Sequence, residues 1–123
     1  MDKAFMRQFH DIPGRERSDQ PMSYCAEYVT YSSDLDEQEL LRLRAVAIKN
    51  VKSVHPALIS VPVLGKRTDG TYFDVWIYEN EEAAQRANTD AHQMADFMNF
   101  FAAVKDVSIE YTCFPESAID PLA

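Results

Sequence analysis

The sequence predicts one α+β domain in which four strands form an antiparallel sheet and two helices cover one of its faces. Two long segments carry apolar residues at spacings of three and four, which is typical of helices. Four shorter segments rich in aromatic and β-branched residues favour strands. The resulting order is β-α-β-β-α-β, and the connections of such a chain place both helices on the same face of the sheet. A length of 123 residues fits one domain.

The first residues of the chain are expected to form a flexible arm outside the domain. Pro13, Gly14 and Pro21 interrupt regular structure there, and the intervening stretch is mostly polar. Chain termini of this kind are commonly disordered. The predicted organisation is an arm over residues 1–22, a domain over residues 23–114 and a tail over residues 115–123.

The first strand and the first helix have clear signals. Residues 23–31 are aromatic and β-branched and are predicted to form a strand. Residues 32–34 offer helix caps, and the acidic residues that follow suit the positive end of a helix dipole. An apolar stripe continues over residues 35–54. His55 is expected to end the helix, because a residue before proline disfavours the helical conformation.

The second half of the chain supplies two strands, a helix and a last strand. Pro62 lies within the apolar strand 57–64 and indicates an edge position or a bulge, because proline has no N–H to donate. An Asp-Gly turn then leads to the alternating strand 71–78. A helix is predicted from about Glu81, capped by Asn80, with Asn88-Thr89-Asp90 as a place where it could kink. Residues 107–114 form the fourth strand.

The charge of the chain argues against two classes of partner. Twenty acidic and twelve basic side chains give a net charge of −8, which repels both the nucleic-acid backbone and an anionic membrane surface. No apolar run is long enough to span a bilayer, and the N-terminus lacks the apolar region of a signal peptide. The sequence is interpreted as a cytoplasmic protein that binds neither nucleic acids nor membranes.

The two cysteines are predicted to be neighbours in space. Cys25 and Cys113 lie on the first and fourth strands, which are adjacent and antiparallel in the predicted topology. The strain of a cross-strand disulfide and a reducing cytoplasm both favour two buried thiols. The chain has no cluster of cysteine and histidine with metal-ligand spacing, so neither a metal nor another cofactor is predicted.

Self-association is the expected way to cover the second face of the sheet. Strands with tyrosine, tryptophan, valine and isoleucine on both sides would otherwise expose a large apolar patch. Successive residues of a helix are about 100° apart, so Phe100 is expected to leave the core and meet a partner chain or a lid. The sequence therefore predicts a homodimer formed through the sheet.

The run from Gly65 to Glu82 resembles a known family. A hairpin closed by Asp-Gly is followed by an aromatic strand ending Trp76-Ile77-Tyr78 and by an acidic helix start. Over residues 23–114 this pattern is similar to the ferredoxin-like domains of the dimeric α+β barrel superfamily, and within it to the antibiotic biosynthesis monooxygenase-type domain. Members commonly carry Trp just before the helix start. Here Tyr78 holds that position, and Trp76 shares its strand face.

The resemblance implies a small-molecule-binding domain similar to cofactor-independent monooxygenases of aromatic, polyketide-type substrates. The alternative is a non-catalytic homodimeric binding or assembly module of the same fold. Haem binding and degradation ranks third, because similar haem degraders use a helix histidine where this chain has Ala87 or Asn88, and a first-strand asparagine that it lacks. A cavity of roughly 300 Å³ or more beside Trp76 and Tyr78 would favour ligand binding.

Six residues are candidates for the site, each with a structural role in the core or at the surface as its alternative. His92 suits a base or a substrate-orienting group, and Trp76 and Tyr78 can stack on a flat ligand. Glu27 and Glu110 lie mid-strand on neighbouring strands and could share a proton, or pair with a cation such as Arg86 or Lys105. The candidate catalytic residues are His92, Tyr78 and Asp74, and the candidate contacts to a small aromatic ligand are Trp76, Asn88 and Glu27.

Overall fold

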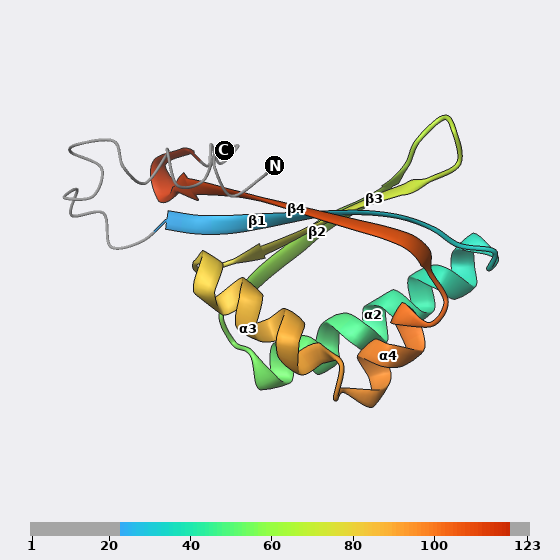
Figure 1. Cartoon of the computed structure of the whole chain (residues 1–123), viewed down its shortest axis with the longest axis horizontal. Coiled ribbons are helices and arrows are strands. Elements are labelled where there is room, and N and C mark those ends of the chain that lie inside the picture. The colour runs from blue at the N-terminus through green and yellow to red at the C-terminus, as the bar shows by residue number, and fades with distance from the viewer. Residues whose placement is uncertain (1–22, 119–123) are drawn as a thin grey trace.

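The computed structural model describes residues 23–118, which form one antiparallel sheet with three helices packed on one face (Figure 1). The sheet has the strand order β2-β3-β1-β4, so the predicted βαββαβ topology is confirmed. The predicted arm lies outside the described residues, and no helix within them is both long and apolar enough to span a membrane. The elements are β1 (Ser23–Ser32), α2 (Glu37–Val54), β2 (Leu58–Lys66), β3 (Tyr72–Tyr78), α3 (Glu81–Ala91), α4 (Ala95–Phe101), β4 (Lys105–Pro115) and a short 3-10 helix (Glu116–Ala118).

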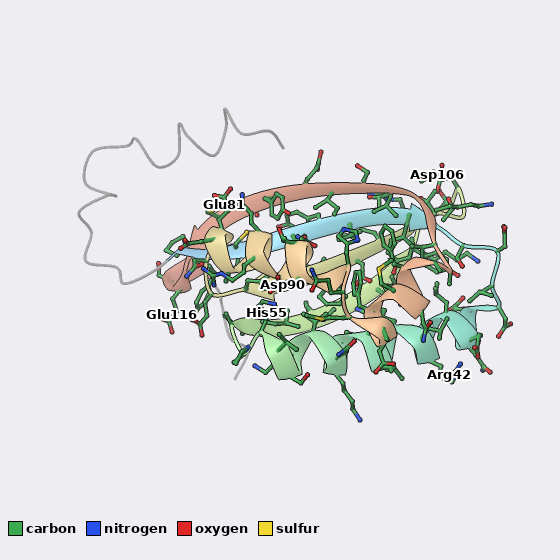
Figure 2. The ribbon with its side chains drawn as sticks, turned by 60° about the horizontal axis from the view of Figure 1, so that its bottom comes forward. Arg42, His55, Glu81, Asp90, Asp106 and Glu116 are labelled. Carbon is green, nitrogen blue, oxygen red and sulfur yellow. The ribbon has the colours of Figure 1, made fainter. Side chains whose placement is uncertain are left out.

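The first helix, α2, begins two residues later than the sequence predicts. Its cap is Asp36, whose side chain accepts a hydrogen bond from the backbone N–H of Gln38 at 3.1 Å, whereas Ser33 caps the preceding turn. The predicted end at His55 is confirmed, since its backbone N–H closes the last turn. The imidazole Nε2 lies 3.0 Å from a carboxylate oxygen of Asp90 on α3, which places the ends of the two helices side by side (Figure 2).

The second helical segment is broken into two helices, which the sequence does not predict. Its N-terminus is as expected, because Asn80 accepts a hydrogen bond from the N–H of Ala83 at 2.7 Å. The chain then leaves the helical conformation at Met94, beyond the proposed kink at residues 88–90, and α4 begins at Ala95. The side chain of Asn50 on α2 accepts from the N–H of Phe97 at 3.2 Å. A contact from another helix therefore stabilises the start of α4.

The turn and edge predictions are confirmed. Strand β2 lies at the edge of the sheet. Its pairing with β3 shifts register twice, between Leu58 and Ser60 and between Ser60 and Val63, and the second interval contains Pro62. Gly70 has a positive φ of 93°, which glycine adopts without strain. Its N–H donates to the carbonyl of Arg67 at 2.9 Å and closes the hairpin between β2 and β3.

Burial alternates strictly along β3, so the sheet has one covered face and one less covered face. Tyr72, Asp74, Trp76 and Tyr78 point toward the helices and are buried, and the residues between them are half-buried. Figure 1 shows α2, α3 and α4 all on this inner side. The core and any site in it therefore lie between β3, β1 and the helices.

The two cysteines are neighbours, as predicted. Cys25 and Cys113 are directly opposite each other in the pairing of β1 with β4, and no disulfide joins them. Both side chains are buried. A hydrogen bond to Cys113, together with burial, raises the pKa of the Cys25 thiol. The predicted antiparallel pairing of the first and fourth strands is thereby confirmed.

The prediction for Phe100 is wrong. Its side chain is buried and meets the ring of Tyr31 edge to face, with the centroids 5.9 Å apart. Phe97, Phe100 and Phe101 are separated by three and four residues, and side chains at those spacings share one helix face. All three therefore turn inward from α4 and line the same cavity.

Candidate functional site

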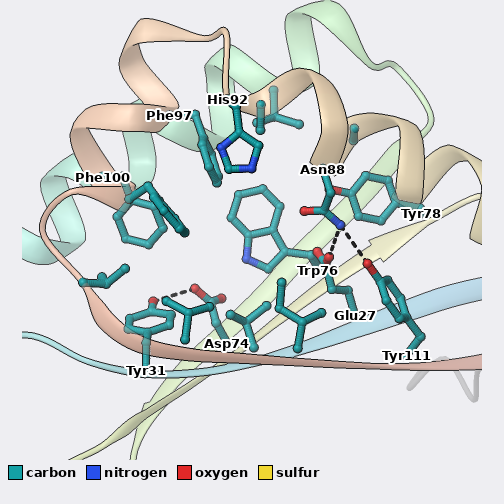
Figure 3. Close-up of a pocket in the computed structure, with 18 residues that line it drawn as sticks. Glu27, Tyr31, Asp74, Trp76, Tyr78, Asn88, His92, Phe97, Phe100 and Tyr111 are labelled. Atoms are coloured by element: carbon teal, nitrogen blue, oxygen red, sulfur yellow. Dashed lines mark hydrogen bonds between the residues drawn. The ribbon is translucent and has the colours of Figure 1, made fainter. Parts of the chain in front are cut away.

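A cavity of about 360 Å³ lies between the inner face of the sheet and helices α3 and α4 (Figure 3). β4 is an edge strand, and its Ile109 keeps 42% exposure while lining the cavity. His92, which is also exposed, lines the cavity from the end of α3. These two residues mark the side on which the cavity reaches solvent. Its volume exceeds the roughly 300 Å³ that separates a ligand pocket from a filled interior.

Aromatic rings form much of the wall. Trp76 meets Phe97 edge to face, with ring centroids 6.5 Å apart, and Phe97 stacks on Phe101 at 6.0 Å. Tyr78 lies two residues along the same strand face as Trp76, and both side chains are buried. The structure thus brings the two predicted stacking residues into one cavity. A flat apolar ligand would match these surfaces, because offset and edge-to-face contacts between rings are favourable.

Glu27 is a buried carboxyl group in this wall. It lies on β1, directly opposite Trp76 on β3 and Tyr111 on β4, and is 3% exposed. The amide nitrogen of Asn88, from α3, donates to Glu27 and also to the hydroxyl oxygen of Tyr111 at 2.9 Å (Figure 3). Burial raises the pKa of Glu27 to about 7, although the hydrogen bonds from Asn88 and Tyr111 act in the opposite direction.

The tyrosines beside Glu27 keep their protons at neutral pH. Burial and then the charge of Glu27 raise the pKa of Tyr111 to about 12. The same two causes raise the pKa of Tyr78 further above its ordinary range. Each hydroxyl can therefore donate a hydrogen bond to a bound molecule or to the carboxylate, but neither acts as a base.

Asp74 lies deeper in the wall and is held by two partners. Its side chain is fully buried, and Arg44 of α2 donates two hydrogen bonds to it at 2.9 and 2.8 Å. The hydroxyl of Tyr31 donates a third at 2.8 Å. The buried charge that the sequence singles out is therefore compensated by a bidentate ion pair, the geometry in which arginine binds carboxylates most strongly.

His92 stands at the mouth of the cavity. It is the C-cap of α3, and its imidazole meets the ring of Phe101 edge to face at 5.8 Å. In Figure 3 it points into the cavity above Trp76, on the side away from Glu27. It is in a position to contact a ligand that enters, while remaining exposed to solvent.

Glu27 and Glu110 do not form a pair. Glu27 lies opposite Tyr111, whereas Glu110 lies opposite Tyr28, and successive residues of a strand point to opposite faces. Glu27 therefore faces the helices and Glu110 the other side of the sheet. The partners of Glu27 are the amide and the phenol described above, instead of Arg86 or Lys105.

The positions compared with haem degraders both line the cavity. Ala87 has no ligand atom, and the amide of Asn88 is engaged by Glu27 and Tyr111. Histidine, cysteine, methionine and tyrosine are the usual axial ligands of haem iron. Within residues 23–118, no group of three or more histidine, cysteine, aspartate or glutamate side chains could hold a metal ion.

The sequence did not predict two neighbours of the candidate residues. Tyr111 completes the cluster around Glu27, and Arg44 neutralises Asp74. The strand pairing could have indicated Tyr111, since it lies directly across from Glu27 once the cysteines fix the register. No comparable signal singles out Arg44 among the arginines and lysines of α2.

No protein-family model and no curated protein matches this sequence, but solved structures do match the fold. SnoaB from Streptomyces nogalater, a cofactor-independent oxygenase, matches with a TM-score of 0.56 and 13% identity, over 75% of this chain and 91% of that one. A Caulobacter crescentus CB15 protein named as an antibiotic biosynthesis monooxygenase has a TM-score of 0.57 and 16% identity, over 80% and 95% of the two chains. A nipsnap family protein of unknown function from Agrobacterium tumefaciens C58 has a TM-score of 0.53 and 10% identity, over 75% and 88%. The chain therefore has the ferredoxin-like α+β fold of the antibiotic biosynthesis monooxygenase-type proteins.

Proposed function

We propose that this protein binds a flat aromatic small molecule in the cavity and oxidises it with dioxygen without a cofactor. The observation that carries the proposal is the cavity itself, about 360 Å³ in volume, with Trp76 and three phenylalanines in its wall. Its polar groups are few and lie at three places, around Glu27, around Asp74 and at His92. This combination of an apolar enclosure and a few convergent polar groups is typical of small-molecule sites.

The chemistry needs no electrons from the protein. A CH₂ group that two aromatic rings make acidic loses a proton, and the resulting carbanion reduces dioxygen. One oxygen atom stays on the carbon as C=O, and the other leaves as water with the two hydrogens of the CH₂ group. The protein contributes orientation, a proton acceptor and hydrogen bonds to the developing negative charge. The similarity to SnoaB supports this choice of reaction.

Turnover and simple binding are separated by one experiment. A three-ring aromatic ketone with such a CH₂ group is added to the purified protein under air, and oxygen uptake is recorded beside thermal unfolding. At about 100 times its dissociation constant the ligand should stabilise the protein by about 2.7 kcal/mol. Uptake of one dioxygen per ketone supports the oxygenase. Stabilisation without uptake supports the non-catalytic module. If the ketone causes neither stabilisation nor oxygen uptake, both functions are contradicted.

Replacing His92 by alanine should weaken the site without unfolding the domain. The side chain is exposed, so its loss should change the free energy of unfolding by only about 0.5 kcal/mol. Loss of one hydrogen bond to the ligand should reduce affinity or turnover about fivefold to tenfold. Titration with the same ketone measures the affinity, and a His92→Gln variant should recover part of it. Unchanged binding and uptake in His92→Ala would assign His92 to the surface.

We further propose that two copies associate through the sheet face opposite the helices. Tyr28 on β1 stacks on Phe73 of β3, with ring centroids 5.8 Å apart, on that face. Val75 and Ile77 are half-buried there, and Val63 of β2 is 50% exposed. An apolar sheet surface of this kind suits contact with a second copy. Such a dimer would place the two cavities on the outer sides.

A lysine in the centre of this face should separate the copies. Val75→Lys is expected to sediment as a monomer at micromolar concentration while the wild type sediments as a dimer, because the interface would bury a charge. Val46→Lys is the matched control, since Val46 is 38% exposed on α2, away from the sheet. Sedimentation of the wild type as a monomer would contradict the dimer.

A further inference from the structure

The carboxyl group of Glu27 differs from the other carboxyl group of the cavity in having no cation beside it. Asp74 is paired with Arg44. Within residues 23–118, no lysine, arginine or histidine forms an ion pair with Glu27. Its hydrogen-bond partners, Asn88 and Tyr111, are neutral. A buried carboxylate that lacks a cation carries a large desolvation cost, which it lowers by taking up a proton.

The groups that surround Glu27 hold its carboxylate in position. Because these groups are donors, stay protonated or are already paired, Glu27 is the strongest proton acceptor in that part of the cavity wall. Asn88 from α3 and Tyr111 from β4 both act as donors toward it. Tyr78 on β3 remains protonated, and the oxygens of Asp74 are engaged by Arg44 and Tyr31. Cys25, two residues before Glu27, also keeps its proton, since its pKa is raised. A ligand proton that reaches this wall therefore has one acceptor.

We propose that Glu27 is the proton acceptor of the site and that it selects uncharged aromatic ligands with a weakly acidic hydroxyl or CH₂ group. The inference rests on the proposed function and assigns the proton transfer to a residue inside the cavity. His92 then keeps an orienting role at the mouth. In the step itself, the O–H or C–H bond of the ligand breaks, its electron pair stays on the ligand, and the proton bonds to a carboxylate oxygen of Glu27.

The same carboxylate disfavours the binding of anions in the cavity. An anionic ligand would place its charge beside Glu27 in a cavity whose lining, among the described residues, contains no lysine or arginine. Like charges at such short range in a low-dielectric site repel strongly. A neutral ligand with an acidic proton meets the opposite situation, because a hydrogen bond to a carboxylate is stronger than one to a neutral acceptor. Glu27 therefore favours ligands that carry an acidic proton and disfavours ligands that carry a negative charge.

Three probes that share one ring system test this assignment. They are 2-naphthol, which has an acidic hydroxyl; 2-methoxynaphthalene, which lacks the proton; and 2-naphthoate, which is an anion. Dissociation constants are measured by fluorescence at about pH 8, where Glu27 is mostly ionised. The wild type should prefer 2-naphthol over its methyl ether by about tenfold or more and should bind 2-naphthoate about tenfold more weakly than the ether.

The Glu27→Gln variant should change the two preferences in opposite directions. The preference for 2-naphthol should fall by about fivefold, because a neutral acceptor replaces the carboxylate, while binding of 2-naphthoate should improve. Glu82→Gln is the matched control, because Glu82 lies on α3 with its side chain 83% exposed and should leave all three constants unchanged. A purely structural effect of Glu27→Gln would move all three probes together.

The outcomes separate this inference from the function on which it rests. Retained binding of the methyl ether in Glu27→Gln shows that the cavity is intact. If the preferences for the three probes are then the same as in the wild type, Glu27 is not the acceptor, although the cavity still binds aromatic ligands. If neither 2-naphthol nor its ether binds to the wild-type protein, the proposed function is contradicted, and the inference with it.

Discussion

Replacing Arg44 by methionine should reduce the free energy of unfolding by about 3–5 kcal/mol, the cost of leaving a buried charge without its partner. Asp74 is fully buried and the Arg44 side chain is only 11% exposed. After the substitution the carboxylate keeps the hydroxyl of Tyr31 as a donor, but it loses both bonds to the guanidinium. Urea denaturation of the two proteins measures the difference.

A neighbouring arginine provides the matched control. Arg42 also makes a short ion pair, at 2.6 Å to Glu39, but the two side chains are 62% and 45% exposed. Figure 2 shows Arg42 at the surface of α2. Arg42→Met should cost at most about 1 kcal/mol, as is usual for exposed pairs. Adding Asp74→Asn to Arg44→Met should restore part of the lost stability, because it removes the unpaired charge. Equal losses in the two single variants would contradict this account of the core.

The second large effect is a dependence of stability on pH that comes from Glu27. Its pKa rises from 4.5 to about 7 on folding, so the folded state binds this proton more tightly than the unfolded state. The resulting stabilisation is fully present below about pH 4.5 and is lost as the pH rises through about 7. The interval corresponds to about 3 kcal/mol.

Comparison with a variant isolates this contribution from the many other acidic groups. Glu27→Gln has no carboxyl to titrate at this position. The free energy of unfolding of the variant minus that of the wild type should therefore increase by about 3 kcal/mol between about pH 4.5 and pH 8. Guanidinium denaturation at several pH values measures the difference. Glu82→Gln should follow the wild type, since its side chain is exposed. A constant difference between Glu27→Gln and the wild type across this range would show that folding does not raise the pKa of Glu27.

Local sequence signals were sufficient for most of the fold. Asn80 caps its helix as expected, Gly70 closes the predicted hairpin and Pro62 lies in an edge strand. Each of these depends on the backbone chemistry of one residue and its neighbours. The break before α4 was not predictable in this way, because residues 81–104 contain neither glycine nor proline. The break is accompanied by a contact from Asn50, which lies 47 residues away from Phe97.

The candidate site residues show the same difference between features that local sequence predicts and features that depend on distant contacts. The aromatic face of β3, with Trp76 and Tyr78, follows from strand periodicity, and so does the position of Asp74 on that face. The state of each carboxyl group does not follow from the sequence. Glu27 and Asp74 are both buried acids on inward faces. Asp74 is neutralised by Arg44, whereas Glu27 has only neutral partners. Electrostatic environment depends on which side chains approach from other elements.

The sequence by itself determined the order of the strands and helical segments, the strand neighbours and the β3 residues that face the helices, because periodicity, capping and turn chemistry act over a few residues. Only the tertiary structure decided that a cavity remains between the sheet and α3 and α4, and that Asn88 and Tyr111 meet at Glu27. These features arise where α3, β1 and β4 converge. Their geometry is fixed by packing among elements distant in sequence, which no local pattern records.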